Sequence, residues 1–89
     1  MIVSFLPSFL KKCRKFPEDL QNEIDEKISL FRSDPLHPFL KIHKLHGMFK
    51  NSWSFSVNYR YRIIFQYLSK DEVILLAIGD HEIYKQNQI

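Results

Sequence analysis

The chain has 89 residues, a formal net charge of +3 and a hydrophobic fraction of 45%. A chain of this length has room for one small core, and so much apolar content excludes an intrinsically disordered protein. No apolar run reaches the roughly 20 residues that a membrane-spanning helix needs. We therefore expect one domain over residues 1–89 and no association with a membrane.

Cysteine usage and the apolar start of the chain bear on the compartment. Cys13 is the single cysteine, so an internal disulfide is impossible and a reducing compartment is expected. The opening MIVSFLPSFLKKC differs from a secretory signal, because its charges follow the apolar residues and no small-residue cleavage site appears. We expect a cytoplasmic protein.

Charges are segregated along the chain. Asp34 and Asp71 bound a window that contains no acidic residue. The window holds cations and histidines, namely His37, Lys41, His43, Lys44, His46, Lys50, Arg60, Arg62 and Lys70. Such segregation predicts a positive surface that suits a polyanion. In the alternative, acidic residues of a neighbouring helix neutralise this face; these are Glu18, Asp19, Glu23, Asp25 and Glu26.

The first elements in chain order are a strand and a helix. Residues 2–5 form a short apolar run, and Pro7 stops it and suits the first turn of a helix. Apolar residues then recur at three- and four-residue spacing up to Phe16, which gives the helix one apolar stripe. Pro17 is expected to end this helix.

A second helix is predicted after Pro17 from apolar residues spaced by four, four and three. They are Leu20, Ile24, Ile28 and Phe31. Acidic residues in the first turn and Arg32 in the last match the helix dipole. The helix must end before Pro35, and residues 35–41, which contain two prolines, predict an extended connection.

Four strands are predicted in the second half. Residues 43–50 partly alternate, and the turn after them leads into residues 53–58 as a hairpin. Residues 53–58 alternate apolar and polar, as in a strand with one buried and one wet face. The runs 62–68 and 73–78 follow, and the almost wholly apolar last run indicates a central strand.

This element order, β-α-α-β-β-β-β, points to an α+β fold. Two helices are expected to pack on one face of a small, mostly antiparallel sheet. The segment after Gly79 is expected to leave the sheet and bring His81 close to Arg60 and Arg62.

Three segments follow one another in a distinctive order: HKLHGMFKNSWSFSV at 43–57, YRYRIIF at 59–65 and AIGDHEIY at 77–84. With them the chain resembles, over essentially its whole length, the RelE/ParE superfamily of bacterial toxin–antitoxin toxins, in particular the RelE/StbE-type ribonucleases and their YafQ-like branch. The resemblance implies a RelE-like fold and a toxin that cleaves mRNA on the translating ribosome. It also implies an antitoxin partner that holds the toxin inactive in a heteromeric complex.

Metal-free RNA cleavage needs a base for the 2′-hydroxyl proton, an acid for the 5′-oxygen and a cation near the phosphate. The resemblance implies that His81 is a general acid or base, that Arg62 contacts the scissile phosphate, and that His43 matches a histidine used by some members. Tyr84 is expected to stack on a base or to supply a hydroxyl. The expected RNA contacts, beside contacts to 16S ribosomal RNA, are Lys41, Lys44, His46, Lys50 and Arg60. No cofactor is expected, and the four histidines lack the paired spacing and the second cysteine of a zinc site.

Each role has a structural alternative. His81 and Tyr84 are also plausible as a cap and a packing residue, and Arg62 as an ion-pair partner of Asp80 or Glu82. For the two hairpin histidines, His43 and His46, a plain surface position stays open.

Ser54 and Ser56 stand where some members of the family carry lysines, so lysine-based catalysis on that strand is not expected. Two other functions remain open. One is a ParE-like toxin that blocks DNA gyrase without cleaving RNA. The other is a degenerate toxin that only binds RNA or an antitoxin.

Overall fold

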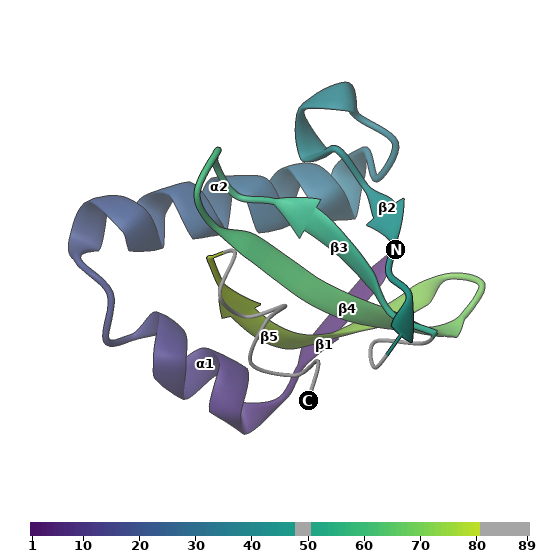
Figure 1. Cartoon of the computed structure of the whole chain (residues 1–89), viewed down its shortest axis with the longest axis horizontal. Coiled ribbons are helices and arrows are strands. Elements are labelled where there is room, and N and C mark those ends of the chain that lie inside the picture. Colours follow the sequence, from purple (N-terminus) through teal and green to yellow (C-terminus); the bar gives the residue numbers. More distant parts are fainter. Residues whose placement is uncertain (48–50, 81–89) are drawn as a thin grey trace.

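The computed structural model describes residues 1–47 and 51–80. Within this part of the chain, five strands form one mixed sheet in the order β1-β5-β4-β3-β2, accompanied by two α-helices (Figure 1). The strands are β1 (Ile2–Phe5), β2 (His43–Lys44), β3 (Trp53–Ser56), β4 (Arg62–Ser69) and β5 (Glu72–Gly79), and the helices are α1 (Pro7–Cys13) and α2 (Glu18–Ser33). Only β1 and β5 pair in parallel within this sheet. The predicted α+β fold, with a mostly antiparallel sheet and β5 in its interior, is confirmed.

Both helices pack on the same face of the sheet. Phe31 of α2 stacks on Phe55 of β3 with ring centroids 4.5 Å apart, and its ring also lies 4.8 Å from that of Phe65 in β4. These three rings are fully buried. From α1, Phe9 and Cys13 join the same core. Successive residues of a strand point to opposite faces. The strand neighbours of Phe55 and Phe65 therefore point away from the helices.

The polar side of β3 differs from the prediction of a wet face. Ser52, Ser54 and Ser56 are only 3%, 0% and 5% exposed. We refer to these three residues as the serine row. Each of them contacts a polar side chain of a neighbouring strand, so each buried hydroxyl has a hydrogen-bond partner.

The end of α1 also differs from the sequence-based prediction. The helix ends at Cys13, and a tight turn follows in which the amide of Phe16 donates to the carbonyl of Cys13. Phe16 therefore does not continue the helical stripe. Its ring packs instead on Tyr61, with centroids 5.4 Å apart.

The extended connection predicted for residues 35–41 contains a short 3-10 helix, η1 (Pro38–Leu40). His37 caps it, because its Nδ1 accepts a hydrogen bond of 3.1 Å from the amide of Phe39. Leu40 is fully buried and anchors the turn to the core, and Lys41 closes it in a left-handed conformation with φ of +48°.

The ends of α2 and of the first hairpin complete the comparison. α2 ends at Ser33, before Pro35, as predicted. β2 is shorter than the predicted strand, because it contains only His43 and Lys44, which pair with Ser54 and Trp53. Among the described helices none has the length and apolar character needed to cross a bilayer.

Candidate functional site

The serine row organises the polar face of the sheet. Ser52, directly before β3, and Ser54 and Ser56 within it share the side of the strand opposite Phe55, and two residues of a strand advance the chain by roughly 7 Å. Ser52 accepts from the amide of Gln66 at 3.1 Å. The other two hydroxyls contact the two described side chains, His43 and Arg62, that were expected to do chemistry.

Arg62, the first residue of β4, is held at the end of this row. Its Nη1 donates to Ser56 Oγ at 2.5 Å and lies 3.5 Å from the carbonyl oxygen of Asn58. Ser56 and Arg62 are also direct partners in the pairing of β3 with β4. The protein thus holds the guanidinium at one nitrogen. The N–H donors of a guanidinium lie in one plane in a fork-like arrangement that suits a phosphate.

The turn between β3 and β4 is anchored on α2. Asn58 Oδ1 accepts from the amides of Arg60 and Tyr61 at 2.9 and 2.8 Å, and its Nδ2 donates to Glu23 at 3.0 Å. Lys27 donates to the carbonyl of Val57 at 3.1 Å. Helix α2 therefore fixes the turn that carries Arg60 and leads into Arg62. Glu23 meets an amide here, which is not the charge neutralisation considered from the sequence.

His43 of β2 is held in one orientation from both ring nitrogens. Its Nδ1 lies 3.2 Å from the carbonyl oxygen of Lys41, and its Nε2 lies 3.4 Å from Ser54 Oγ. A carbonyl only accepts, so Nδ1 carries the proton in this arrangement. In the neutral ring Nε2 then carries the electron pair, which faces the Ser54 hydroxyl here and is the group that a general base uses.

The end of β5 comes to the same place. Gly79 pairs with Arg62 across β4 and β5, and the next residue, Asp80, lies with its Oδ2 4.0 Å from Nη2 of Arg60. The sequence-based expectation that the chain after Gly79 passes close to these two arginines holds as far as residue 80. His81 itself lies outside the described residues.

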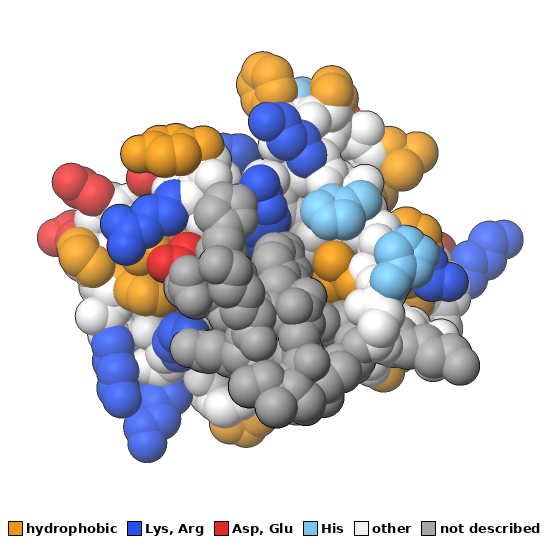
Figure 2. Space-filling model, viewed as in Figure 1, with side chains coloured by type: hydrophobic (Ala, Val, Ile, Leu, Met, Phe, Trp, Pro, Cys, Tyr) orange, Lys and Arg blue, Asp and Glu red, His pale blue; other side chains and the backbone are white. Residues whose placement is uncertain are grey.

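The remaining predicted site residues fall into two groups. Lys41, Lys44, His46 and Arg60 are exposed, and Figure 2 shows blue cations and pale blue histidines on the face that carries β2 and β3, with most red carboxylates of this view near the start of α2. Tyr84 and Lys50, like His81, lie outside the described residues. Within residues 1–47 and 51–80 no three histidine, cysteine, aspartate or glutamate side chains are grouped as a metal site requires.

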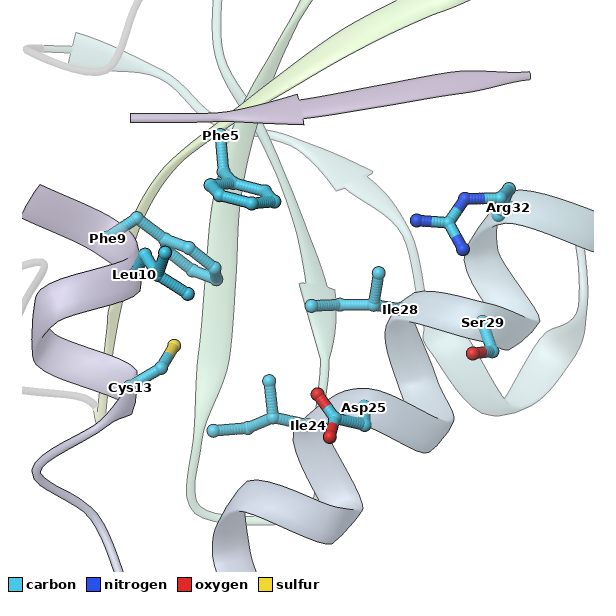
Figure 3. A pocket seen from close by; sticks show the side chains of 9 residues that line it. All are labelled: Phe5, Phe9, Leu10, Cys13, Ile24, Asp25, Ile28, Ser29 and Arg32. Atoms are coloured by element: carbon cyan, nitrogen blue, oxygen red, sulfur yellow. The ribbon is translucent and has the colours of Figure 1, made fainter. Parts of the chain in front are cut away.

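A hollow on the helix side has a different character. It measures about 350 Å³ and is lined by apolar side chains of β1, α1 and α2, with Asp25, Ser29 and Arg32 along α2 (Figure 3). Cys13 faces it from α1. Burial, followed by the nearby Asp25 carboxylate, raises the pKa of this thiol from 9.0 to about 11. The thiol is therefore protonated at neutral pH and is a poor nucleophile.

The polar face thus brings together a fixed guanidinium, an oriented imidazole and exposed cations, and this combination suits a phosphodiester. Sequence reasoning identified His43 and Arg62 but missed the residues that hold them: Ser54, Ser56 and Asn58. A signal was present, because small polar residues alternate with aromatic ones directly between the histidine and the arginine.

Searches with the three-dimensional structure find bacterial and archaeal toxins. YafQ from E. coli strain BL21(DE3) superposes with a TM-score of 0.73 at 18% identity, covering 92% of this chain and 94% of that one. A YoeB–YefM complex from Staphylococcus aureus gives 0.71 at 15% identity, with 91% and 97% covered. A RelE–RelB complex from Pyrococcus horikoshii OT3 gives 0.70 at 17% identity, with 89% and 92% covered.

These likenesses establish the fold. Two helices and a five-stranded mixed sheet in this arrangement are the fold of RelE-, YoeB- and YafQ-type toxins of toxin–antitoxin pairs. No protein-family model matches the sequence, and no curated protein matches it either.

Proposed function

We propose that this protein is the toxin of a toxin–antitoxin pair and that it inhibits translation by cleaving mRNA on the ribosome. The observation that carries the proposal is the pair of side chains on the serine row: Arg62 held by Ser56 and His43 held by Ser54. The two serines are neighbours on one face of β3, so one nucleotide and its phosphate can reach both side chains. The fold shared with YafQ, YoeB and RelE supports the same function.

The reaction is an internal transfer at phosphorus. A base removes the proton of the 2′-hydroxyl, and the 2′-oxygen forms a bond to phosphorus. The bond from phosphorus to the 5′-oxygen breaks, and an acid gives that oxygen a proton. The products are a 2′,3′-cyclic phosphate and a free 5′-hydroxyl, so neither an oxidant nor a co-reactant is needed.

Each candidate residue has a role in this scheme. Arg62 neutralises the charge that develops on the phosphate oxygens. His43 Nε2 acts as the base, because the Lys41 carbonyl holds the ring proton on Nδ1. His81 acts as the acid and Tyr84 supports a flanking base, and both of these roles rest on the family resemblance. Lys41, Lys44, His46, Lys50 and Arg60 contribute phosphate contacts.

The partners follow from the same proposal. The substrate is mRNA in the cytoplasm, held by the ribosome beside 16S ribosomal RNA. A cognate antitoxin would keep the toxin inactive, as expected from structural neighbours that were crystallised with YefM and RelB.

Brief induction in growing cells tests the proposal. We expect arrested growth and new mRNA 5′-ends, while plasmid supercoiling stays unchanged. The double variant His81→Ala, Arg62→Ala should relieve the arrest, and Lys70→Ala, which removes an exposed cation in the turn after β4, should not. Intact transcripts with altered supercoiling would instead identify a gyrase-directed toxin, and a double variant as toxic as the parent would exclude the assigned roles.

A further inference from the structure

Another hollow borders the serine row at Ser56, and the scheme above assigns no base of the RNA to it. It measures about 240 Å³. Its lining comes from η1 and the residue after it, with Phe39 and Lys41, from the β3–β4 turn, with Asn58 and Tyr59, and from α2 with Lys27. Pockets for drug-sized ligands are larger, about 300–1,000 Å³. We call this site the aromatic hollow.

Two aromatic side chains stand exposed at this hollow. Tyr59 is 89% exposed and Phe39 is 69% exposed. Both stand on backbone that is firmly held, since Asn58 closes the turn under Tyr59 and buried Leu40 anchors η1 beside Phe39. Exposed rings on fixed backbone are unfavourable in water and are well suited to stack against a flat, apolar partner.

The charge of the hollow selects an anion. None of its lining residues is acidic, and Lys27 and Lys41 are both among them. The Lys27 ammonium is fixed by its bond to the Val57 carbonyl, and Lys41 is exposed. A ligand with a flat ring and a negative charge meets both requirements, and a nucleotide has both.

The hollow shares residues with the proposed cleavage site. Ser56 and Asn58, which line it, accept the hydrogen bonds of Arg62. Lys41 also lines the hollow, and its carbonyl holds the ring of His43. A phosphate at Arg62 therefore places a neighbouring nucleotide at the aromatic hollow.

We propose that the aromatic hollow binds one unstacked base of single-stranded RNA, next to the phosphate held by Arg62, by stacking on Tyr59 and Phe39. This inference rests on the proposed function. Base–aromatic stacking accepts every base because each has a π-face. The side-chain amide and the serine hydroxyl of the hollow are already engaged, with Asn58 bonded to Glu23 and to two backbone amides and Ser56 bonded to Arg62. Stacking without edge recognition predicts little preference among the four bases at this position.

Binding of a fluorescent RNA tests the inference with the full chain. A short RNA with 2′-O-methyl groups resists cleavage, and one 2-aminopurine is moved through its positions. Stacking at the hollow should quench the fluorophore at one position. Tyr59→Ala and Phe39→Ala should each abolish that quenching and weaken binding roughly five- to hundredfold. Lys41→Gln should lower the slope of log affinity against log salt by about 0.7, the value for one phosphate contact on a single strand.

Two controls keep the result specific. Leu36→Ala removes another large exposed side chain, 87% exposed and close to η1 but not in the lining, and should change nothing. Tyr59→Phe should retain the quenching. Unchanged binding and quenching in both alanine variants would overturn the inference, as would a loss of antitoxin binding in these variants while RNA binding persists.

The same proteins separate this inference from the proposed function. If the parent cleaves mRNA in cells but its RNA complex is insensitive to Tyr59 and Phe39, the inference fails and the proposed function stands. If quenching depends on both rings but no transcript is cut, the hollow stands and the nuclease assignment fails.

Discussion

The two faces of β3 are built from the same short run of residues and serve different purposes. On the helix side, Phe55 packs with Phe31 and Phe65 in a dry core. On the other side, Ser54 and Ser56 are equally buried but contact His43 and Arg62. The comparison teaches that burial alone does not separate residues that stabilise the fold from residues that place a chemical group. Substitutions on the two faces should therefore fail in different assays.

Truncation of the aromatic side chain on the helix side of β3 should have the largest effect on stability. Phe55→Ala removes a fully buried ring from the stack with Phe31 and should lower the free energy of unfolding by about 3–5 kcal/mol. Urea denaturation measures it. Tyr59→Ala removes an equally large but exposed ring and should change stability by no more than about 0.5 kcal/mol. Similar losses for the two variants would contradict the assignment of the core.

Truncation of the serine row should affect activity more than stability. Ser56→Ala frees the Arg62 guanidinium, and since a hydrogen bond to a charged group is worth about 1.5–3 kcal/mol, mRNA cleavage should fall about tenfold or more. Ser52→Ala is the matched control, because it also removes one hydroxyl from the serine row, but this hydroxyl contacts Gln66 and not Arg62.

Ser52→Ala should lower the free energy of unfolding by about 1 kcal/mol, and Ser56→Ala, which loses a bond to a charged group, by about 1.5–3 kcal/mol at most. Parental activity in both Ser56→Ala and Ser52→Ala would show that the bond to Arg62 only supports the sheet. The same reduction of activity in both variants would mean that the row acts through sheet stability.

The last effect concerns Cys13 and is absent at neutral pH, because it appears only at alkaline pH. Its pKa is raised to about 11 in the folded chain, against 9.0 for an ordinary thiol, so between these values the unfolded chain releases a proton that the folded chain keeps. Stability contributed by the buried thiol is therefore complete below about pH 9 and declines as pH rises towards 11.

Comparison with Cys13→Ala isolates this contribution from other titrating groups. The difference in unfolding free energy between parent and variant should shrink as pH rises through that interval, measured by urea denaturation at each pH. A difference that stays constant would show that the thiol is not shielded from solvent in the folded chain.

The fold was largely predictable because hydrophobic period decides which side chains share a face. The alternation from Trp53 onwards predicted β3 and its core residues, and the helical spacing before Ser33 predicted α2. Local capping decided the parts that were missed. Residues 38–40 coil because His37 accepts the amide of Phe39, and Phe16 leaves the helix because Tyr61, distant in sequence, offers a packing surface.

The candidate site was less accessible to sequence reasoning. His43 and Arg62 could be named from a resemblance, but their distance from one another depends on strand pairing. Pairing of β2 with β3 sets His43 opposite Ser54, and pairing of β3 with β4 sets Ser56 opposite Arg62. A shift of one residue in either pairing would place the serines among the phenylalanines, so the register of three strands is needed before the serine row is visible.

Cleavage of a defined mRNA on purified, stalled ribosomes tests most directly whether the polar face of β3 and β4 is a nuclease site. The parent chain should cut the message and leave a 5′-hydroxyl end, and Arg62→Ala should leave it intact while unfolding at nearly the same urea concentration as the parent. Cutting by Arg62→Ala at the parental rate, or an uncut message with the folded parent, would contradict the account.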